Sequence, residues 1–446
     1  TSLTSYLELD TANRVQRGAI AINEPLRVRR ENGVYFDIQV DQADADSWWQ
    51  FVQAFDQRYP AKTPLNPGRS FESMIAAINI QAQRLVYLGQ DWSDVVTTLL
   101  RAENAWLISF NSAEGQAEVA IPHGPEPIFA DVQWVALTSA AEQVPFVDQL
   151  DPLLNYLPSD VPDLSLQINK LIWNQRDLGN WRAEVRVEDG VLTASDLVGQ
   201  MPGATLNGDL LWTREQAKHR TDFNGSIRTG NLQDVLTTWG YAPVLSTRDG
   251  MLDVATHWQG SPAHFDFKRL QGAIGLKFNQ GAILDVPEYE GVKLIGLLNF
   301  TRVLNRIAFD FSDLLRTGIT FDSIDGELLF DRGFARVGER LVIDGSATKF
   351  RFSGDADLLS DELDVDMTLT VPLSSTFPLV ALLAGVSPQA AAAIYVTERV
   401  FNNQLERLSS ARMHVTGSFE APNTRFYRAG AGLVAEPTGP TDSERE

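Results

Sequence analysis

The chain has 446 residues, of which 37 are basic and 58 acidic, so its formal net charge at pH 7 is −21. Hydrophobic residues make up 44% and charged residues 21%, proportions typical of chains that fold around apolar surface, which excludes disorder as the dominant state. The negative charge argues against nucleic-acid binding, because that function needs a basic face to replace phosphate counterions. Cysteine is absent, which excludes thiolate metal sites, a cysteine nucleophile and disulfides.

The first residue is Thr1 instead of methionine, and no signal-peptide pattern follows it. We therefore expect a processed chain or a fragment of a longer protein. At about 150 residues per domain, the length allows roughly three domains or one elongated domain.

Apolar and polar residues alternate with a period of two along the whole chain. Val34, Phe36 and Ile38 point to one side of an expected strand, and Tyr35 and Asp37 point to the other. Such strands are typical of an antiparallel sheet covered on one side, and they predict a mainly β architecture. The apolar positions expected to line one face are Val34, Phe36, Ile38, Val40, Leu164, Leu166, Ile168, Val185, Val187, Ile274, Leu276, Phe278, Phe350, Phe352, Leu363, Val365, Met367, Leu369 and Val371.

Turn signals recur between these strands. The segments typical of tight turns are Asp189-Gly190, Asp249-Gly250, Asn279-Gln280-Gly281, Asp325-Gly326, Asp344-Gly345 and Ser353-Gly354. We therefore expect a sheet built largely from hairpins.

Helical patterns are few. Residues 44–55 place Trp48, Phe51 and Phe55 on one helical face behind an Asp-rich start, and a shorter pattern occupies residues 231–240. We expect four segments. Residues 1–160 form a β segment with this helical insert and a linker at 56–70, and residues 161–290 continue the sheet with the short helix. Residues 291–420 form a carboxy-terminal region with amphipathic helices, and residues 421–446 form a disordered tail.

Two segments have the character of membrane-contacting helices. Residues 293–306 combine an apolar stripe with basic ends, which suits an interfacial helix at anionic headgroups, although a helix that caps a β core fits as well. The uncharged run 367–397 begins as a strand and is divided by Pro378 and Pro388. It predicts two short helices, at 376–396, that lie on a membrane or form a buried hairpin. The residues expected to dock on the membrane are Leu294, Leu297, Leu298, Phe300, Arg302, Arg306, Phe377, Leu379, Leu382 and Leu383.

No arrangement in the sequence indicates an enzyme. The five histidines are scattered, and His257 and His264 lack the spacing of a metalloprotease helix. The acidic residues between 310 and 325 lie beside strand ends and turns, where Asp accepts backbone hydrogen bonds. No nucleophile elbow or Walker loop is present. We expect no catalytic residue, no metal site and no cofactor.

Several sequence phrases match a known family. They are Asn279-Gln-Gly-Ala-Ile-Leu-Asp-Val-Pro, Phe309-Asp-Phe-Ser-Asp-Leu-Leu, Phe321-Asp-Ser-Ile-Asp-Gly and Val415-Thr-Gly-Ser-Phe-Glu-Ala-Pro, with a looser match at Trp258-Gln-Gly-Ser-Pro. On these phrases the chain resembles the carboxy-terminal region of the YhdP-type, AsmA-like envelope proteins. The likeness covers most of the chain and is strongest over its last third.

The resemblance implies an elongated, curled antiparallel sheet that forms a hydrophobic groove, of the AsmA-like, bridge-like lipid-transfer type. It also implies a periplasmic protein of Gram-negative bacteria that conducts phospholipid between the inner and outer membranes. The full-length protein would be anchored in the inner membrane by a helix that this sequence lacks, and the fragment would lie near the outer membrane. Phospholipids, both membranes and envelope proteins are the implied partners.

Two functions are open at this point. The first is a conduit for phospholipid acyl chains that serves outer-membrane lipid homeostasis, because acyl chains on the apolar face leave water at about 0.8 kcal/mol per methylene. The second is a non-transporting periplasmic scaffold or assembly factor with a closed β core that acts through protein partners. A half-open face predicts that Phe36→Glu or Val365→Asp blocks lipid transfer and leaves the chain folded.

Overall fold

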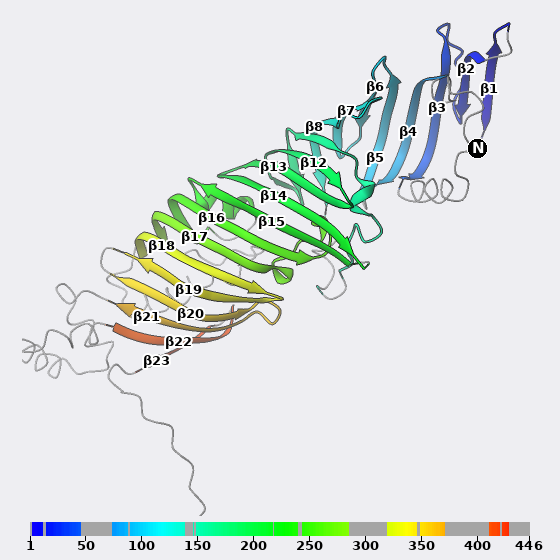
Figure 1. The fold of residues 1–446 in the computed structure, drawn as a ribbon. Helices are drawn as coiled ribbons and strands as arrows, with labels where there is room; N and C mark the ends of the chain where they lie inside the picture. The colour runs from blue at the N-terminus through cyan, green and yellow to red at the C-terminus, as the bar shows by residue number, and fades with distance from the viewer. Residues whose placement is uncertain are drawn as a thin grey trace, which may run out of the picture. The chain divides into compact units, whose positions relative to one another are not determined.

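The computed structural model describes residues 2–11, 15–45, 74–87, 90–138, 146, 149–216, 218–239, 243–284, 319–345, 348–370, 410–419 and 422–427. The chain divides into two compact units. Unit 1 holds residues 1–240 and 251–272, and unit 2 holds residues 241–250 and 273–446. Strands dominate both units, which confirms the predicted mainly β fold (Figure 1).

Unit 1 is built on a sheet whose neighbouring strands are mostly neighbours along the chain. Within the described residues, β1 pairs with β2 alone, so this edge of the sheet does not close on itself. The strands are β1 (Leu3–Leu9), β2 (Val15–Ile22), β3 (Gly33–Asp44), β4 (Ile75–Tyr87), β5 (Gln90–Arg101), β6 (Ala105–Asn111), β7 (Gly115–Pro122), β8 (Ile128–Leu137), β9 (Leu164–Ile168), β10 (Leu171–Trp173), β11 (Arg176–Asp177), β12 (Asn180–Glu188), β13 (Val191–Met201), β14 (Ala204–Glu215) and β15 (Lys218–Thr229).

Most pairs are antiparallel, as predicted, but four of the described pairs in unit 1 are parallel. Strand β3 runs parallel to β2 and to β4, and β8 runs parallel to both β9 and β10. Parallel neighbours cannot be joined by a tight turn, because the chain must first return to the end of the sheet from which it started. The connections concerned are residues 23–32, 45–74 and 138–163. The third of these connections forms part of the candidate site.

The predicted turn at Asp189-Gly190 joins β12 to β13. Both residues have positive φ, 51° and 77°, and Glu188 pairs with Val191 across the turn. A two-residue turn with positive φ at both positions matches the right-handed twist of the strands that it joins.

Four other turn predictions are wrong. Asp249-Gly250 lies inside β16 (Leu245–Gln259), Asn279-Gln280-Gly281 inside β17 (Gln271–Ile283), Asp325-Gly326 inside β18 (Ile319–Asp331) and Ser353-Gly354 inside β20 (Lys349–Asp357). Gly354 has a φ of 123°, and a Cβ there would lie 2.3 Å from the Asp364 carbonyl oxygen. The glycine therefore allows close approach of two strands without reversing the chain.

Unit 2 contains β17 in part and an antiparallel run from β18 to β23. Strands β16 and β17 contribute residues to both units. The bounds of the strands not given above are β19 (Phe334–Asp344), β21 (Glu362–Thr370), β22 (Ser410–Ser418) and β23 (Asn423–Tyr427).

The described helices are short. α2 (Leu232–Thr238) falls within the segment 231–240, where the sequence indicates a helix. Three single-turn 3₁₀ helices are η4 (Pro158–Asp160), η5 (Pro262–His264) and η6 (Phe267–Arg269). No helix in the described part of the chain has the length and apolar character that crossing a membrane requires.

Several sequence predictions lie outside the described residues. These are the helix over 44–55 beyond Ala45, the linker 56–70, the segments 293–306 and 376–396 with all ten membrane-docking residues, Val371, and the tail apart from residues 422–427.

Candidate functional site

One face of the unit 1 sheet carries apolar side chains in register from strand to strand. Residues i and i+2 of a strand share a face, and paired residues lie side by side, so the pairing defines rows that cross the strands. The central row consists of Ile20, Phe36, Ile78, Leu99, Ile108, Val119, Ala130, Leu166 and Ala183. The second row consists of Ile22, Ile38, Ile80, Thr97, Phe110, Ala117, Val132, Ile168 and Trp181. We call this side of the sheet the inner face.

The inner face is long relative to a lipid tail. The central row crosses nine strands, which at about 4.8 Å per step gives about 40 Å, against about 30 Å for the hydrocarbon core of a whole bilayer. A third row continues the face as far as β15. Its members are Ile128, Leu164, Val185, Ala194, Leu210 and Phe223.

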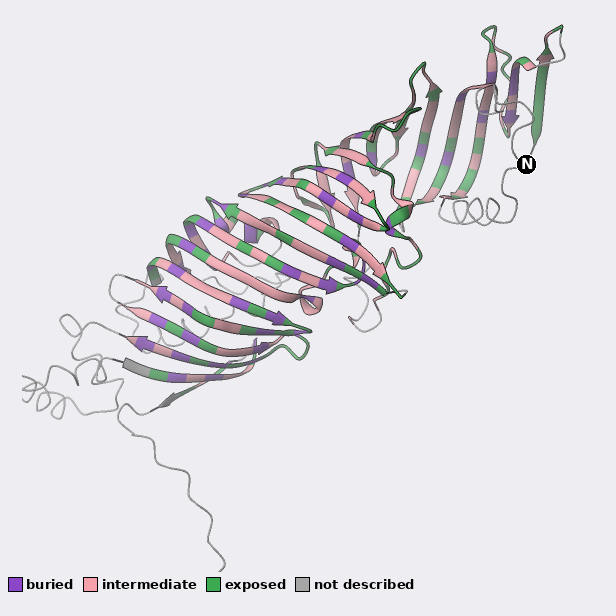
Figure 2. Cartoon of the chain, in the orientation of Figure 1, coloured by how far each residue is buried: buried purple, intermediate pink, exposed green. Residues whose placement is uncertain are grey.

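The inner face from β3 to β9 is only partly covered. Phe36, Ile78, Leu99, Ile108 and Leu166 are all half-buried, neither sealed in a core nor fully exposed. Figure 2 shows how buried, half-buried and exposed residues alternate along these strands. A contiguous, partly exposed apolar surface of this length marks a site for an apolar ligand or partner.

The outer face is more polar. Arg29, in the connection between β2 and β3, pairs with Asp37 at 3.1 Å, and the Asn79 amide donates to the same carboxylate at 2.8 Å. Burial by itself raises the pKa of Asp37, but the hydrogen bonds from Arg29 and Asn79 and the charges of Arg29 and Arg27 outweigh it, so the pKa lies below its ordinary value. This connection therefore covers the outer face of β3 with a polar network.

An exposed apolar row also crosses the outer face, and it is one residue wide. Leu100, Leu107 and Phe129 are 47–49% exposed and follow one another across β5, β6 and β8, with Ala120 of β7 between the last two. Thr98 pairs with Ser109 in the next row, which is polar. The outer face thus lacks the adjacent apolar rows of the inner face.

A connecting segment crosses the inner face at its far end. Residues Gln149–Val161, which we call the strap, belong to the connection between β8 and β9. Strap residues Leu153, Tyr156 and Val161 pack on a cluster of four buried inner-face residues from β12, β13 and β14. The four are Val185, Leu192, Ala194 and Trp212. The strap therefore takes the position on this part of the sheet that an apolar ligand would need.

Two side chains of the sheet bind the strap backbone. The Trp212 indole Nε1–H donates to His219 Nδ1 at 3.0 Å, so the other ring nitrogen, Nε2, carries the proton and donates to the Leu154 carbonyl oxygen at 3.1 Å. His219 is buried on β15. The Trp212–His219 and His219–Leu154 hydrogen bonds hold the strap backbone against the sheet.

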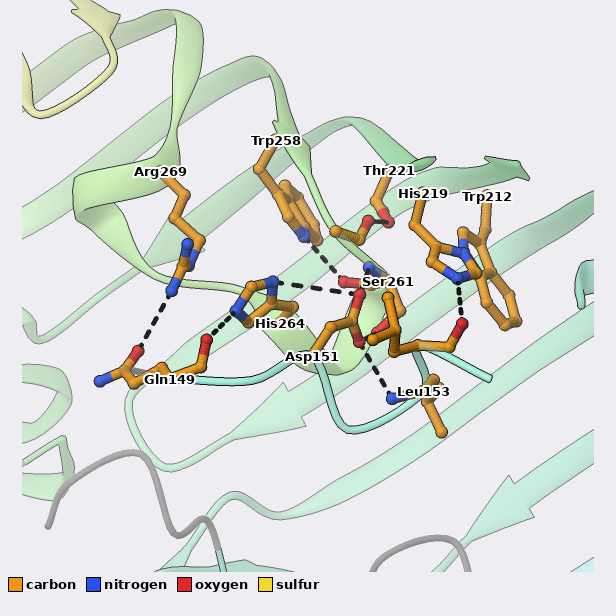
Figure 3. A network of polar contacts seen from close by, with 12 residues as sticks. Gln149, Asp151, Leu153, Trp212, His219, Thr221, Trp258, Ser261, His264 and Arg269 are labelled. Carbon is orange, nitrogen blue, oxygen red and sulfur yellow. Dashed lines mark hydrogen bonds and ion pairs between the residues drawn. The ribbon is translucent and has the colours of Figure 1, made fainter. Parts of the chain in front are cut away.

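Asp151 attaches the strap to the segment that follows β16 (Figure 3). Its carboxylate, 7% exposed, accepts from the Ser261 backbone N–H at 2.7 Å, from the Ser261 hydroxyl and from the Leu153 backbone N–H at 3.0 Å. A buried carboxylate needs such donors to offset its loss of water. Gly260, before Ser261, has a φ of 133°, and a Cβ there would lie 2.6 Å from His264 Nδ1, so this turn requires glycine.

His264 and Arg269 lie near the start of the strap. His264 Nε2 donates to the Gln149 carbonyl oxygen at 3.3 Å, and Nδ1 lies 3.9 Å from Asp151. Burial and the charge of Arg269 lower the pKa of His264, against the opposing charges of Asp151 and Asp266, so the ring is neutral at pH 7. Burial likewise lowers the pKa of Arg269, although Asp266 and Asp151 oppose the shift.

One face of the unit 2 sheet is largely buried. Its buried residues follow the register from β18 to β22, with exposed fractions between 0% for Met367, Met413 and Val415 and 9% for Leu341, whereas Val337, paired with Leu328, is half-buried. Val365 is 2% exposed. The expectation that Val365 lies on a half-open face is therefore wrong, because its side chain is enclosed in a core.

The residues predicted to line one face are thus distributed over both units. In unit 1 the register places Phe36, Ile38, Leu166 and Ile168 in the first two rows and Val185 in the third. Val34 and Val40 lie on the same side of β3, but Val34 is 0% exposed, so its side chain is enclosed and the prediction of a half-open face is wrong at that position. The remaining unit 1 members are Leu164, in the third row, and Val187, which packs against the cluster under the strap. In unit 2, Ile274 and Leu276 are half-buried, whereas Phe278, Phe350, Phe352, Leu363, Met367 and Leu369 are buried.

Sequence reasoning missed the polar residues that hold the strap. Asp151, His219, Ser261 and Arg269 have no recognisable spacing, because segments more than a hundred residues apart bring them together. Two weak signals were present: the Pro-rich zone from 145 to 162, and the phrase Trp258-Gln-Gly-Ser-Pro, in which Ser261 is fully buried. Within the described residues, no group of three His, Asp or Glu side chains could hold a metal ion.

The inner face defines a class of protein: a β-sheet protein whose apolar face is long, partly open and organised in rows across the strands. The comparisons with known proteins identify the family. The family model described as YhdP protein matches residues 1–424, and the chain belongs to this family. The intermembrane phospholipid transporter YhdP of Escherichia coli K12 is 22% identical over 262 residues, which are 58% of this chain and 20% of that protein. The chain thus spans about a fifth of the length of this relative. No solved structure matches the chain.

Proposed function

We propose that the chain binds phospholipid acyl chains on the inner face of unit 1 and conducts them along it, as part of a periplasmic protein that carries phospholipid between the inner and outer membranes and maintains the outer membrane. The observation that carries this proposal is the register of the three apolar rows, since adjacent rows offer unbroken apolar contact from strand to strand. Sequence similarity to a phospholipid transporter supports the choice of phospholipid as the ligand.

The inner face suits a mobile tail better than a fixed ligand. Its rows repeat apolar side chains, aliphatic and aromatic, at nearly equal spacing, so a tail that moves by one strand exchanges one apolar contact for another. Each methylene that stays out of water keeps about 0.8 kcal/mol along the way. The free energy of a bound tail therefore has no single deep minimum along the face, and this is what conduction requires.

A cation–π contact between Arg101 and Trp106 lies at the rim of the inner face. Arg101 of β5 pairs with Trp106 of β6, two residues from Ile108, and its guanidinium lies 5.6 Å from the centre of the indole ring. A guanidinium at the edge of an apolar surface suits the phosphate of a headgroup whose tails lie on that surface. We expect headgroups to follow this rim.

Membrane contact is proposed for the segments 293–306 and 376–396, with the docking residues given above, and envelope proteins are proposed as further partners. The amphipathic and apolar patterns of these segments support the assignment. Leu297→Asp combined with Leu298→Asp is expected to abolish binding to vesicles of anionic phospholipid, and unchanged binding would contradict it.

A second candidate function, a scaffold with a closed β core, is favoured by one observation. The buried face of unit 2 offers little surface to a tail, as its Met413 and Val415 are fully buried. The proposal therefore places lipid conduction in unit 1, and a scaffold function would predict that unit 1 also carries no lipid.

Lipid extraction tests the proposal. The purified chain is incubated with vesicles of phosphatidylglycerol and phosphatidylethanolamine, re-isolated and extracted, and the extract is analysed by mass spectrometry. The proposal predicts phospholipid in stable association with the protein. A chain that emerges free of lipid would refute it and favour the scaffold.

A further inference from the structure

The strap lies over a continuation of the apolar rows. In the third row, Ile128 and Leu164 are half-buried, Val185 and Ala194 are buried under the strap, and Phe223 is half-buried again. The covered residues do not differ in chemistry from the open ones. What differs is that Leu153, Tyr156 and Val161 of the strap supply the apolar contacts there. The strap therefore occupies a position that the rest of the inner face leaves to a ligand.

Asp266 and Asp151 act on the pKa of Arg269 through their charges, but neither carboxylate pairs with its guanidinium. Among the described residues Arg269 forms no ion pair, and its Nε is buried without a hydrogen-bond partner. Its Nη2 reaches the Phe146 carbonyl oxygen at 3.4 Å and the Gln149 side-chain oxygen at 3.5 Å, both at the limit of hydrogen bonding, and the guanidinium lies 4.3 Å from the centre of the Phe146 ring. A phosphate would offer charged oxygens to the whole fork of donors, which is a stronger interaction than two long contacts with neutral oxygens.

The contacts with Arg269 and the contacts with the apolar floor follow one another along the chain. Residues 146 and 149 contact Arg269, and strap residues from Leu153 onward contact the floor. Figure 3 shows Arg269 beside Gln149, and Asp151, Leu153 and the His219–Trp212 pair farther along the strap. Neutral oxygens at residues 146 and 149 face the cation, and apolar side chains from Leu153 onward face the apolar floor. A phospholipid has the same order of groups, an anionic phosphodiester followed by apolar tails.

We propose that Arg269 and the inner face under the strap form a phospholipid-binding site, and that the strap is its built-in competitor. When the strap lifts, the phosphodiester binds Arg269 in place of the oxygens of Phe146 and Gln149. An acyl chain then packs on Val185, Ala194 and their neighbours in place of the strap side chains. The hydrogen bonds of Asp151 and His219 hold the strap in place until lipid arrives. This inference rests on the proposed function, and deepens it by assigning a headgroup contact and a control point.

Locking the strap tests the competition. Because the chain contains no cysteine, Asp151→Cys combined with Ser261→Cys introduces the only two thiols, at side chains in direct hydrogen-bond contact. Dibromobimane bridges them. Photoreactive benzoylphenylalanine is placed at Leu210, beneath the strap, or at Val119, in the open central row, and vesicles of equal parts phosphatidylglycerol and diacylglycerol supply the lipid.

The bridge is expected to lower lipid adducts at position 210 at least about tenfold and to leave those at position 119 unchanged. Equal adducts at position 210 with and without the bridge would overturn the competition. Adducts at 119 with none at 210 in the unbridged chain would overturn the site alone, whereas none at either position would refute the proposed function. If the Leu210 probe prevents folding, Val187, a half-buried residue that also packs against the cluster under the strap, replaces it.

The headgroup contact is tested by Arg269→Gln, with Arg220→Gln as the matched control. Arg220 pairs with Asp222 on the opposite side of β15 from Thr221, away from the strap. The ratio of phosphatidylglycerol to diacylglycerol adducts at position 210 is expected to fall about tenfold in the first variant and to stay constant in the second, since the two lipids differ in the phosphodiester headgroup. A ratio that is unchanged by Arg269→Gln would refute the phosphate contact, whatever its effect on the strap.

Discussion

Replacing Ile108 by glutamate tests the inner face near the middle of the central row. Ile108 is half-buried and pairs with Leu99 and Val119, so a tail on this face contacts all three. Loss of about half the transfer free energy of an isoleucine side chain removes about 1 kcal/mol of tail binding. A carboxylate that must lose water against the tail adds about 2 kcal/mol. The sum predicts tail binding about a hundredfold weaker.

The matched control is Leu107→Glu, the same change one residue earlier on β6. Leu107 is 47% exposed and belongs to the narrow apolar row of the outer face. Because neither side chain is enclosed in a core, both variants are expected to unfold at similar temperatures. The outer-face variant is expected to keep the lipid binding of the unmodified chain.

The assay is transfer of fluorescent phosphatidylglycerol from quenched donor vesicles to acceptor vesicles by the purified chain. We expect transfer to be nearly abolished by Ile108→Glu and preserved by Leu107→Glu. Equal loss in the two variants would show that charge on the sheet is harmful on either side. Full transfer with Ile108→Glu would refute the reasoning that tails lie on the central row.

Three further predictions concern stability. Val365→Asp puts a charge where the side chain is 2% exposed, so urea unfolding should show a loss of about 3 kcal/mol or more, and a stable variant would show that this face is open. Because the pKa of Asp37 is lowered in the folded state, its contribution is complete above its ordinary pKa of about 4 and is lost as the pH falls through the lowered pKa. The difference in stability between the chain and Asp37→Asn should shrink over that range, and a pH-independent difference would contradict it. Trp212→Phe removes the donor to His219 and should speed chymotrypsin cleavage in the strap; an unchanged rate would show that this bond does not hold it.

The general fold was predictable because the alternation of apolar and polar residues is a direct record of two-sided strands. Phe36 and Ile38 share a face in the structure as their spacing indicates, and so do Leu166 and Ile168. The glycine-containing pairs were less informative. Asp189-Gly190 reverses the chain, but Ser353-Gly354 lies inside a strand, since glycine serves both a turn and a close approach between strands.

The parallel pairs could not be predicted from local pattern. Period-two alternation is the same whichever way the neighbouring strand runs, so nothing in β8 or β9 indicates that they are parallel. The consequence for the site is large. Parallel pairing makes the connection between them return along the sheet, and this return is what carries Leu153 and Tyr156 onto the inner face.

The state of each face was equally beyond local pattern. Phe36 and Val365 occupy similar alternating sequences, yet the first is half-buried and the second is enclosed. Alternation shows that one side of a strand is apolar, but not whether another element covers that side. Asp151 and Ser261, 110 residues apart, meet only because the strap crosses the sheet.

The most direct test of lipid on the inner face compares two adjacent residues of β5. Leu99 belongs to the central row, whereas Leu100, 49% exposed, faces the other side. A photoreactive residue at each position, irradiated in the presence of phospholipid vesicles and analysed by mass spectrometry, reports which side the tails contact. We expect phospholipid adducts at position 99 and few at position 100, although Leu100 is the more exposed. Equal adducts, or more at position 100, would contradict the assignment of the inner face as the lipid path.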